Sequence, residues 1–306
     1  MTSRSYDVVI IGAGPAGIQA AIHASRKKTD VLVLGRSENS ALYWAHVENY
    51  ACVEGIQEGK DLLAAGHRQM EKFGARRMAE DVLKINQQEN SFELELESGS
   101  HITAKAIVFA VGVSKKKLSV PGEKEFNGRG VSYCVDCDAN FYRGATVAVV
   151  GDRSAAVDGA LTLLGYADTV YLVAKELQVS QELRERLDQS NVEVLEKTWV
   201  KSIDGENAVT GITLDNGEKI AVEGVFVELG SKGALELATQ LGVALDTEQF
   251  KFINTTRKQE TNIPGVYAAG DIVGPPYQMA KAVGEGCVAG MEAAAFARKL
   301  KKQQSA

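Results

Sequence analysis

The sequence predicts an α/β fold made of two Rossmann-like, three-layer domains, with the second domain inserted in the first. At two places a short apolar run ends at a glycine and passes into a helical pattern, first at Gly12 and again at Gly151. These places lie about 140 residues apart, which is the size of a whole domain. The chain has 306 residues, of which 45% are hydrophobic and 24% charged, so it is long enough to bury two cores.

The elements of the first domain follow from the apolar pattern. Residues 7–11 form a short apolar run typical of a buried parallel strand, and the turn GAGPAG follows it. A helical pattern over 18–24 and a second apolar strand at 31–34 complete a βαβ unit. Residues 91–97 alternate in the manner of a strand, and 106–111 form another apolar strand.

The second domain repeats this pattern after a polar, turn-rich stretch, KKKLSVPGEKEF at 115–126, which we expect to cross between domains. A strand is expected at 146–150, then a helix, then a second strand at 170–173. Alternating strands are expected from there to about residue 230.

The expected domain boundaries follow from this order. The first domain would comprise 1–117 and 247–306, with residues 118–246 inserted as the second domain. We expect a long helix rich in Ala and Gly from 279 to about 299, and a disordered tail over 301–306.

Composition and charge narrow the class of protein. No apolar run reaches the length of about 18 residues that a membrane helix needs. The N-terminus enters a strand at once, so we expect a cytoplasmic protein without a signal peptide, and no membrane or nucleic-acid partner. The net charge is −6. Residues 118–246 contain 11 Lys and Arg against 21 Asp and Glu, a net charge of −10, while the rest of the chain carries +4.

The first glycine turn is a specific motif for dinucleotide binding, which makes these domains of the nucleotide-binding type. GAGPAG contains Gly12, Ala13, Gly14, Pro15, Ala16 and Gly17. In such a loop the first glycine makes the turn, the second lets the backbone approach a pyrophosphate, and the third lets helix and strand pack closely. At the end of the second strand, Gly35 stands where an acidic partner for a ribose often lies.

The stretch SYCVDCDANFY predicts a redox-active disulfide between Cys134 and Cys137, with Asp138 beside it to move protons. A zinc site would need a second pair of ligands, but Cys52 and Cys287 are isolated and expected to be unreactive core residues. The histidines are scattered and receive no catalytic role: His23, His46, His67 and His101. The alternative is that the Cys-x-x-Cys is a buried, unreactive pair.

These motifs, with three others, identify a family. The others are VENY at 47–50, IPGVYAAGDI, and GEGCVAG near the end of the chain, and the disulfide motif extends to FNGRGVSYCVDCD. On them, over nearly its whole length, the chain resembles the low-molecular-weight thioredoxin reductase family. The resemblance implies a homodimer that binds FAD, reduces thioredoxin, and has its FAD domain split around a pyridine-nucleotide domain that carries the disulfide. In this family a glycine at Gly35 is ordinary.

The resemblance also assigns roles residue by residue. The glycines of GAGPAG would hold the FAD pyrophosphate, Asp271 would reach its ribitol and phosphate side, and Gln278 would approach the flavin ring. Cys137 would exchange electrons with the flavin, and Cys134 would attack the disulfide of a partner protein. Asp138 would act as the acid and base of that exchange.

The chain departs from the family where NADPH would bind. The family has GxGxxA in the second loop, but here residues 151–156 read GDRSAA, with Arg153 in place of the middle glycine. The family's HRRxxxR is replaced by Ala174, Lys175, Glu176 and Ser180 at its four defining positions. The site therefore looks like one that has lost its cofactor, because the arginines that bind a 2′-phosphate are missing.

Electrons would then have to reach FAD by another route. Within the superfamily, atypical members take electrons from reduced ferredoxin or from a deazaflavin, and the basic flanking parts of this chain favour an acidic ferredoxin. The alternatives are an NADPH site built from Arg153 and Lys175, NADH held by Glu176, or a second flavin or structural relic in the cleft. A non-enzymatic redox sensor would carry the same motifs. Tyr43 and Trp44 would either pack or shield the flavin or a partner surface.

Overall fold

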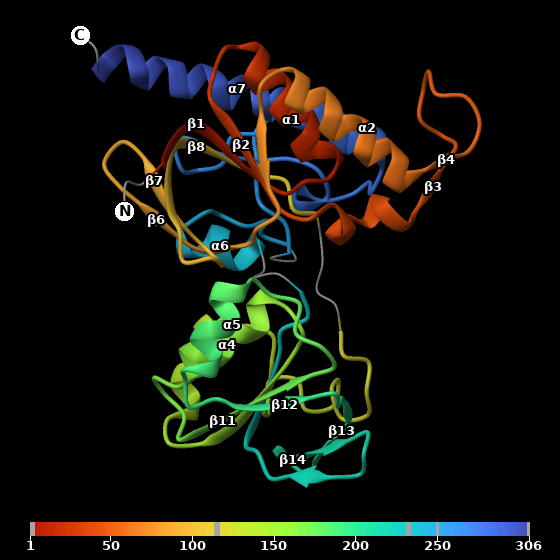
Figure 1. Cartoon of the computed structure of the whole chain (residues 1–306), viewed down its shortest axis with the longest axis vertical. Coiled ribbons are helices and arrows are strands. Elements are labelled where there is room, and N and C mark those ends of the chain that lie inside the picture. Colours follow the sequence, from red (N-terminus) through yellow and green to blue (C-terminus); the bar gives the residue numbers. More distant parts are fainter. Residues whose placement is uncertain (1–3, 113–116, 231–233, 249–250, 305–306) are drawn as a thin grey trace. The chain divides into compact units, whose positions relative to one another are not determined.

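The structure is a computed structural model, and it describes residues 4–112, 117–230, 234–248 and 251–304. Contacts along the chain divide it into two compact units (Figure 1). Unit 1 comprises Met1–Leu96, Ser100–Ser114 and Ala234–Ala306, and unit 2 comprises Glu97–Gly99 and Lys115–Gly233. Both ends of the sequence belong to unit 1, so the second unit is inserted in the first, as the internal repeat predicts.

The boundaries differ from the expected ones, above all at the return to unit 1, which lies at 233/234 rather than at 246/247. Helix α6 (Ala234–Gln240) and the residues after it belong to the core of unit 1. Leu237, Ala238 and Leu241 are buried there. These apolar side chains decide the boundary, because they pack on the sheet of unit 1.

Unit 1 contains a seven-stranded sheet in the order β5-β2-β1-β8-β7-β6, with β17 also paired to β8. Its strands are β1 (Arg4–Ile11), β2 (Val31–Leu34), β5 (Arg76–Met78), β6 (Val82–Gln87), β7 (Phe92–Leu96), β8 (His101–Phe109) and β17 (Val266–Ala268). The first four predicted strands are confirmed as β1, β2, β7 and β8. The pairs β5–β2, β2–β1, β1–β8 and β8–β17 are parallel, and β6–β7–β8 is antiparallel.

Helices cover both faces of this sheet. On one face lie α1 (Pro15–Arg26), α2 (Gly59–Lys72) and α7 (Met279–Gln304), and on the other lies α6 (Figure 1). Strand β1 is buried on both sides: Val8 and Ile10 join the core under α1, while Val9 and Ile11 join the core under α6. This is the three-layer arrangement that the continuous apolar run predicts. A short hairpin, β3 (His46–Val47) and β4 (Gln57–Glu58), and the 3-10 turns Ser37–Asn39, Ala41–Trp44 and Asp271–Val273 complete the unit.

Unit 2 has a parallel five-stranded sheet in the order β12-β11-β10-β16-β9 and a three-stranded antiparallel sheet, β13-β14-β15. The parallel strands are β9 (Val131–Ser132), β10 (Thr146–Val150), β11 (Thr169–Ala174), β12 (Glu193–Glu196) and β16 (Gly224–Val227). The antiparallel strands are β13 (Val200–Gly205), β14 (Val209–Leu214) and β15 (Lys219–Ile220). Its helices are α3 (Val135–Asp138), α4 (Ser154–Leu163) and α5 (Gln181–Asp188), with a 3-10 turn at Ala139–Tyr142. The strands expected after 173 are present as β12 to β16, and the helix α5, which was not expected, precedes them.

The glycines of GEGCVAG let α7 lie against α1. A Cβ on Gly286 would lie 2.2 Å from the carbonyl oxygen of Ala16, and a Cβ on Gly290 would lie 2.2 Å from that of Ala20. Both distances are far below van der Waals contact. The spacing of four residues places both glycines on one face of the helix, so the close packing of α1 and α7 depends on their missing side chains.

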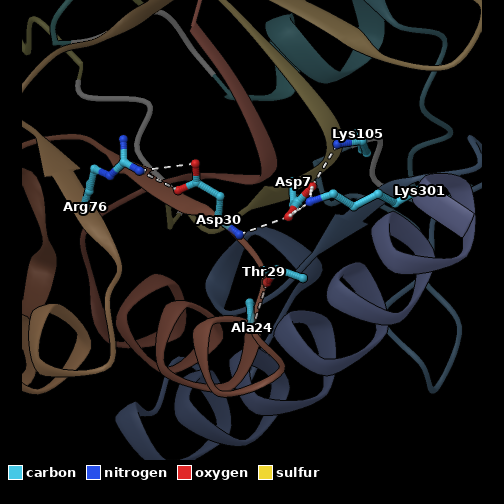
Figure 2. A network of polar contacts seen from close by, with 7 residues as sticks. All are labelled: Asp7, Ala24, Thr29, Asp30, Arg76, Lys105 and Lys301. Atoms are coloured by element: carbon cyan, nitrogen blue, oxygen red, sulfur yellow. Dashed lines mark hydrogen bonds and ion pairs between the residues drawn. The ribbon is translucent and has the colours of Figure 1, made fainter. Parts of the chain in front are cut away.

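The predicted disorder of the tail was wrong for residues 301–304, because α7 continues to Gln304; residues 305–306 lie outside the described residues. Figure 2 shows Lys301 of this last turn reaching Asp7 on β1, with Nζ 3.3 Å from Oδ2. Lys105 donates to the other carboxylate oxygen of Asp7 at 2.8 Å, and the main-chain N–H of Asp30 donates to Oδ2 at 3.1 Å. Burial raises the pKa of Asp7, but these donors outweigh it and the net shift is downward. The ion pair therefore anchors the end of α7. Within the described ranges, no helix combines the length and apolar character of a membrane span.

Candidate functional site

The first glycine loop has the geometry that its sequence predicts. Gly12 has φ +122°, and a Cβ there would lie 2.2 Å from the carbonyl oxygen of Ala110. A Cβ on Gly17 would lie 1.9 Å from the carbonyl oxygen of Gly12, so α1 packs directly on the turn. Gly14 is the N-cap of α1, and a Cβ there would meet only the side chain of Ser40, at 3.1 Å from Oγ. The first and third glycines are thus required by packing, and the second leaves space in front of the helix.

The start of α1 has backbone donors for an anion. Pro15 opens the helix, and the first helical bond runs from the N–H of Ile18 to the carbonyl of Gly14. In the part of the chain that the structure describes, no backbone carbonyl accepts a hydrogen bond from the N–H of Ala16 or Gly17. These two groups and the positive end of the helix dipole fit a pyrophosphate.

Asp271 lies beside this loop, at the turn that follows β17. A Cβ on Gly270 would lie 3.0 Å from the Cβ of Ala16, so the turn touches the start of α1. The Asp271 carboxylate is half-buried, and it accepts no hydrogen bond within the described ranges. Burial raises its pKa, and the charge of Lys281 opposes that shift. A partly desolvated carboxylate without a donor suits a cofactor hydroxyl group.

Two residues of α7 hold this turn in place, and neither was among the residues predicted to form the site. Glu285 accepts a hydrogen bond from the N–H of Gly270 at 2.8 Å. Lys281 donates to the carbonyl oxygens of Gly270 and Gly274 at 2.9 and 2.6 Å and lies 3.2 Å from Glu285. The GEGCVAG helix therefore positions Asp271 as well as α1.

Gln278, the predicted neighbour of the flavin ring, lies just before α7. Its side-chain oxygen accepts a hydrogen bond from Asn49 at 3.2 Å. Asn49 belongs to VENY, so two motifs separated by 229 residues meet here. Both side chains are exposed. The contact of Gln278 with a flavin stays a prediction.

His67 supports the glycine loop from α2, a role that sequence analysis missed. Its side chain is buried, with Nε2 3.0 Å from the carbonyl oxygen of Ala13 and Nδ1 3.4 Å from Oγ of Ser37. Burial lowers the pKa of His67 below its ordinary value, and the hydrogen bond to Ala13 only partly offsets this. A signal did exist in the sequence, because His67 continues the buried stripe of Leu63 and Met70 on α2.

The Cys-x-x-Cys lies at the start of α3 as a disulfide with a Cα–Cα distance of 5.3 Å. Cys134 is the N-cap, and its Sγ accepts a hydrogen bond from the N–H of Cys137 at 3.2 Å. Cys134 is half-buried and Cys137 is exposed. After reduction, the same N–H would stabilise a thiolate on Cys134, since a charged sulfur is the stronger acceptor.

Asp138 and Ser132 flank the disulfide. The hydroxyl of Ser132 donates to Oδ2 of Asp138 at 2.6 Å, and its oxygen accepts from the N–H of Cys134 at 3.1 Å. The N–H of Asp138 donates to the carbonyl of Cys134 at 3.2 Å. The predicted acid–base residue therefore lies one hydrogen-bonded side chain away from the backbone of Cys134.

The second glycine loop repeats the turn of the first. A Cβ on Gly151 would lie 2.1 Å from the carbonyl oxygen of Glu228 and 2.8 Å from the Cβ of Ala156. These two contacts match those of the first and third glycines in the first loop. Arg153 is the N-cap of α4 in an extended conformation, φ −130° and ψ −174°, which any residue adopts. The two glycine loops therefore share the same turn, and they differ at the middle position, where Arg153 replaces a glycine.

At the start of α4, backbone N–H groups are hydrogen bonded to carbonyl oxygens of this same chain. The N–H of Ala155 donates to the carbonyl oxygen of Gly230 at 3.3 Å, and the N–H of Ala156 donates to that of Arg153 at 3.1 Å. The neighbouring loop closes on the same turn, since the N–H of Gln178 donates to the carbonyl of Asp152 at 2.7 Å. Fewer backbone donors remain here for a pyrophosphate than at α1.

The residues that replace the family's arginines have structural roles. Lys175 lies over the ring of Trp199, with Nζ 5.5 Å from its centroid. Ser180 is the N-cap of α5, and its Oγ accepts from the N–H of Leu183 at 3.2 Å. Glu176 is exposed. Lys175 and Ser180 are thus engaged within unit 2.

Two remaining expectations have different outcomes. Cys52 is exposed, so its prediction as a core residue was wrong, whereas Cys287 is half-buried on α7. Tyr43 packs against the core of unit 1, and Trp44 beside it is 77% exposed. The described residues contain no group of three or more His, Cys, Asp or Glu side chains arranged for a metal ion.

Comparison with known proteins identifies the class. The model of the family described as Pyridine nucleotide-disulphide oxidoreductase matches residues 6–286. The chain belongs to this family, and it is a flavoprotein disulfide oxidoreductase of the thioredoxin reductase type.

Individual relatives agree with this class. Thioredoxin reductase of Listeria monocytogenes is 34% identical over 317 residues, which cover 99% of this chain and 97% of that protein. The chain is also 34% identical to the bifunctional thioredoxin reductase/thioredoxin of Mycobacterium leprae, but it spans only 65% of that protein's length.

Two solved structures share the fold. The atypical thioredoxin reductase TRi from Desulfovibrio vulgaris Hildenborough has a TM-score of 0.82 and 34% identity, covering 97% of this chain and 99% of that one. A ferredoxin-flavin thioredoxin reductase from Clostridium acetobutylicum has a TM-score of 0.69 and 33% identity, with both chains fully covered.

Proposed function

We propose that this protein is a thioredoxin reductase that binds FAD and receives its electrons from reduced ferredoxin. The observation that carries the proposal is the contrast between two otherwise similar glycine loops. At α1 the N–H groups of Ala16 and Gly17 have no backbone acceptor among the described residues, whereas at α4 the N–H of Ala155 is bonded to Gly230. Arg153 also stands where a nucleotide needs a glycine.

The residues of unit 1 fit FAD. The loop from Gly12 to Gly17 would hold its pyrophosphate, the Asp271 carboxylate would accept a hydroxyl of its ribitol side, and Gln278 would lie by the ring. FAD, when bound, supplies a carrier that accepts electrons singly and passes two to a disulfide. His67 would keep the loop in shape through the carbonyl of Ala13.

The disulfide residues would perform the exchange. The Cys134 thiolate, stabilised by the N–H of Cys137, attacks one sulfur of the thioredoxin disulfide, which forms a mixed disulfide and releases one thioredoxin thiolate. The Cys137 thiolate then attacks Sγ of Cys134, which restores the intramolecular disulfide and releases the second thiolate. Two electrons pass to thioredoxin, and Asp138 would deliver protons to the leaving sulfurs.

The surroundings of the disulfide suit a protein substrate. Phe141 lies four residues after Cys137 and is 83% exposed. An exposed aromatic side chain four residues from a reactive cysteine favours contact with another protein over a small thiol.

The choice of ferredoxin rests on charge and on a relative. By the units of the structure, unit 2 contains 14 Lys and Arg against 20 Asp and Glu, a net charge of −6, while unit 1 contains 20 of each, so an acidic donor would be repelled less by unit 1 than by the disulfide-bearing unit. One of the similar solved structures is a ferredoxin-flavin thioredoxin reductase. We further propose a cytoplasmic homodimer, on the resemblance to the family, which light scattering of the purified protein would test.

The test is anaerobic bleaching of the visible flavin band, with NADPH, NADH, a reduced deazaflavin or photoreduced ferredoxin in separate cuvettes. The expected result is rapid bleaching by ferredoxin alone, followed by sustained reduction of thioredoxin. Rapid bleaching by a nicotinamide nucleotide or only by the deazaflavin would overturn the choice of donor. Bleaching without thioredoxin turnover would indicate a redox sensor instead of a reductase.

A further inference from the structure

A buried carboxylate, Glu123, is hydrogen bonded to Tyr133, the residue before Cys134, and has no part in the exchange described above. Glu123 is 4% exposed, and three donors point at it. Its Oε1 accepts from the N–H of Leu118 at 2.8 Å and from the hydroxyl of Tyr133 at 2.9 Å, and its Oε2 accepts from the N–H of Ser119 at 2.6 Å. A carboxylate with three donors is the form in which a buried charge is stable.

Two of these donors, the N–H groups of Leu118 and Ser119, hold the backbone near the start of unit 2. Ser119 has φ +59°, a left-handed conformation that is uncommon for a residue with a side chain. Its N–H and that of Leu118 are both held by Glu123, so the carboxylate supports this bend. The chain enters unit 2 on a rigid turn.

The third donor to Glu123 is the hydroxyl of Tyr133, the residue directly before Cys134. The ring of Tyr133 packs against the core of unit 2 that includes Val131 and Phe126. Burial, then the hydrogen bond to Glu123 and its charge, raise the pKa of Tyr133 to about 12. The hydroxyl therefore stays protonated and donates to Glu123 at any physiological pH.

We propose that Glu123, acting through Tyr133, is a positioning residue that holds Cys134 at the N-cap of α3. This inference rests on the proposed function for the identity of the attacking sulfur. Ser132 and Tyr133 precede Cys134, and their hydroxyls donate to two different carboxylates, Asp138 and Glu123. The two residues that precede Cys134 are thus each fastened to a carboxylate.

The consequence concerns the reduced protein. The thiolate of Cys134 gains stability from the N–H of Cys137 only while Cys134 stays at the N-cap, where the two atoms are 3.2 Å apart. Without the Tyr133 hydroxyl, the backbone before Cys134 loses one of its anchors and this hydrogen bond becomes less well formed. Less thiolate would then be present at neutral pH, so Cys134 would react more slowly.

The experiment measures alkylation of the reduced holoprotein by iodoacetamide, with peptide mapping to separate Cys134 from the other cysteines. The variant is Tyr133→Phe, which keeps the packed ring and removes only the hydroxyl. The matched control is Tyr171→Phe, because Tyr171 also packs on this core and is hydrogen bonded to a carboxylate, Glu193. Thermal unfolding of each variant shows that the fold is intact.

Tyr133→Phe is expected to slow alkylation of Cys134 at pH 7 by about 3- to 10-fold, with its rate–pH profile moved to higher pH. Tyr171→Phe should match the parent protein. Glu123→Gln should slow the reaction at least as much, and adding Tyr133→Phe to it should have little further effect, because both act on one contact.

An unchanged Cys134 profile in a folded Tyr133→Phe protein would overturn the proposal, as would equal slowing in the Tyr171→Phe control. Alkylation needs neither ferredoxin nor thioredoxin. Failure of this inference is therefore distinguishable from failure of the proposed function, which turnover with those partners tests separately.

Discussion

The main-chain N–H of Ala155 donates a hydrogen bond to the carbonyl oxygen of Gly230, 3.3 Å away. The equivalent group at the start of α1, the N–H of Ala16, has no backbone acceptor within the described ranges. The two helices follow the same type of strand and the same tight turn, so this difference separates a loop suited to an anion from one closed by its own chain.

Restoring the missing glycine should not restore a nucleotide site. In Arg153→Gly, the N–H of Ala155 remains bonded to Gly230, and Ala174 and Ser180 still replace residues that would bind a 2′-phosphate. We expect no gain in bleaching of the flavin by NADPH. The matched variant in the first loop, Gly14→Arg, should weaken FAD binding at least about tenfold, since the side chain fills the space before α1. NADPH reduction of Arg153→Gly would contradict this account.

The two cysteines should separate the two half-reactions. Cys134→Ser is expected to abolish thioredoxin reduction, a loss of at least about 1000-fold, while flavin reduction by the donor stays intact. Cys137→Ser should also block turnover but leave a Cys134 thiol that can form a mixed disulfide with thioredoxin. Cys52→Ser, at an exposed free cysteine, serves as the control and should turn over normally. Normal turnover by Cys134→Ser would contradict the assignment of Cys134 as the residue that attacks the thioredoxin disulfide.

Asp138→Asn should slow thioredoxin reduction by about 100-fold, because the amide cannot deliver a proton. The amide oxygen can still accept the hydrogen bond from Ser132, so the backbone at Cys134 should stay in place. Stopped-flow reduction of the flavin should be unchanged, and unaltered thioredoxin turnover would assign proton transfer to another group.

His67 should make the free energy of unfolding depend on pH. Its folded-state pKa lies below the ordinary value of 6.5, so the unfolded chain binds the proton more readily. Stability should fall as pH drops from about 6.5 toward the lower folded-state pKa, by at most about 1.4 kcal/mol per pH unit for this group. Urea unfolding at several pH values would measure it. His67→Asn should flatten the dependence, and an unchanged dependence in this variant would contradict the role given to His67.

The packing of α7 on α1 should tolerate no side chain at Gly286. Gly286→Val places atoms against the carbonyl of Ala16 and should cost about 1–3 kcal/mol of unfolding free energy, with weaker retention of FAD. Gly284 lies on the same helix, and a Cβ there would meet no described atom within 4 Å, so Gly284→Ala is the control. It should stabilise the protein by up to about 1 kcal/mol through helix propensity. Equal effects at both positions would refute the packing role.

Much of the framework could be predicted from local pattern. The strands β1, β2, β10 and β11, the turns at Gly12 and Gly151, and the helix from Met279 all follow from apolar runs and glycine spacing. Predictions failed where a contact with a distant residue overrides local composition. The polar residues 301–304 are helical, and Lys301 pairs with Asp7, 294 positions away. The segment after residue 233 belongs to unit 1 because the side chains of Leu237 and Leu241 are buried in the core of that unit.

By itself, the sequence determined the repeated turn, the Cys-x-x-Cys and the loss of the nucleotide motif, because each depends on residue types at fixed short spacing. Only the tertiary structure decided which groups support them. His67 reaches Ala13 across 54 positions, Gln278 reaches Asn49 across 229, and Ala155 is bonded to Gly230. Such pairs leave no periodic signal. Each forms because the folded chain brings a distant donor and acceptor together, and for the buried His67 the bond also offsets the cost of removing a polar group from water.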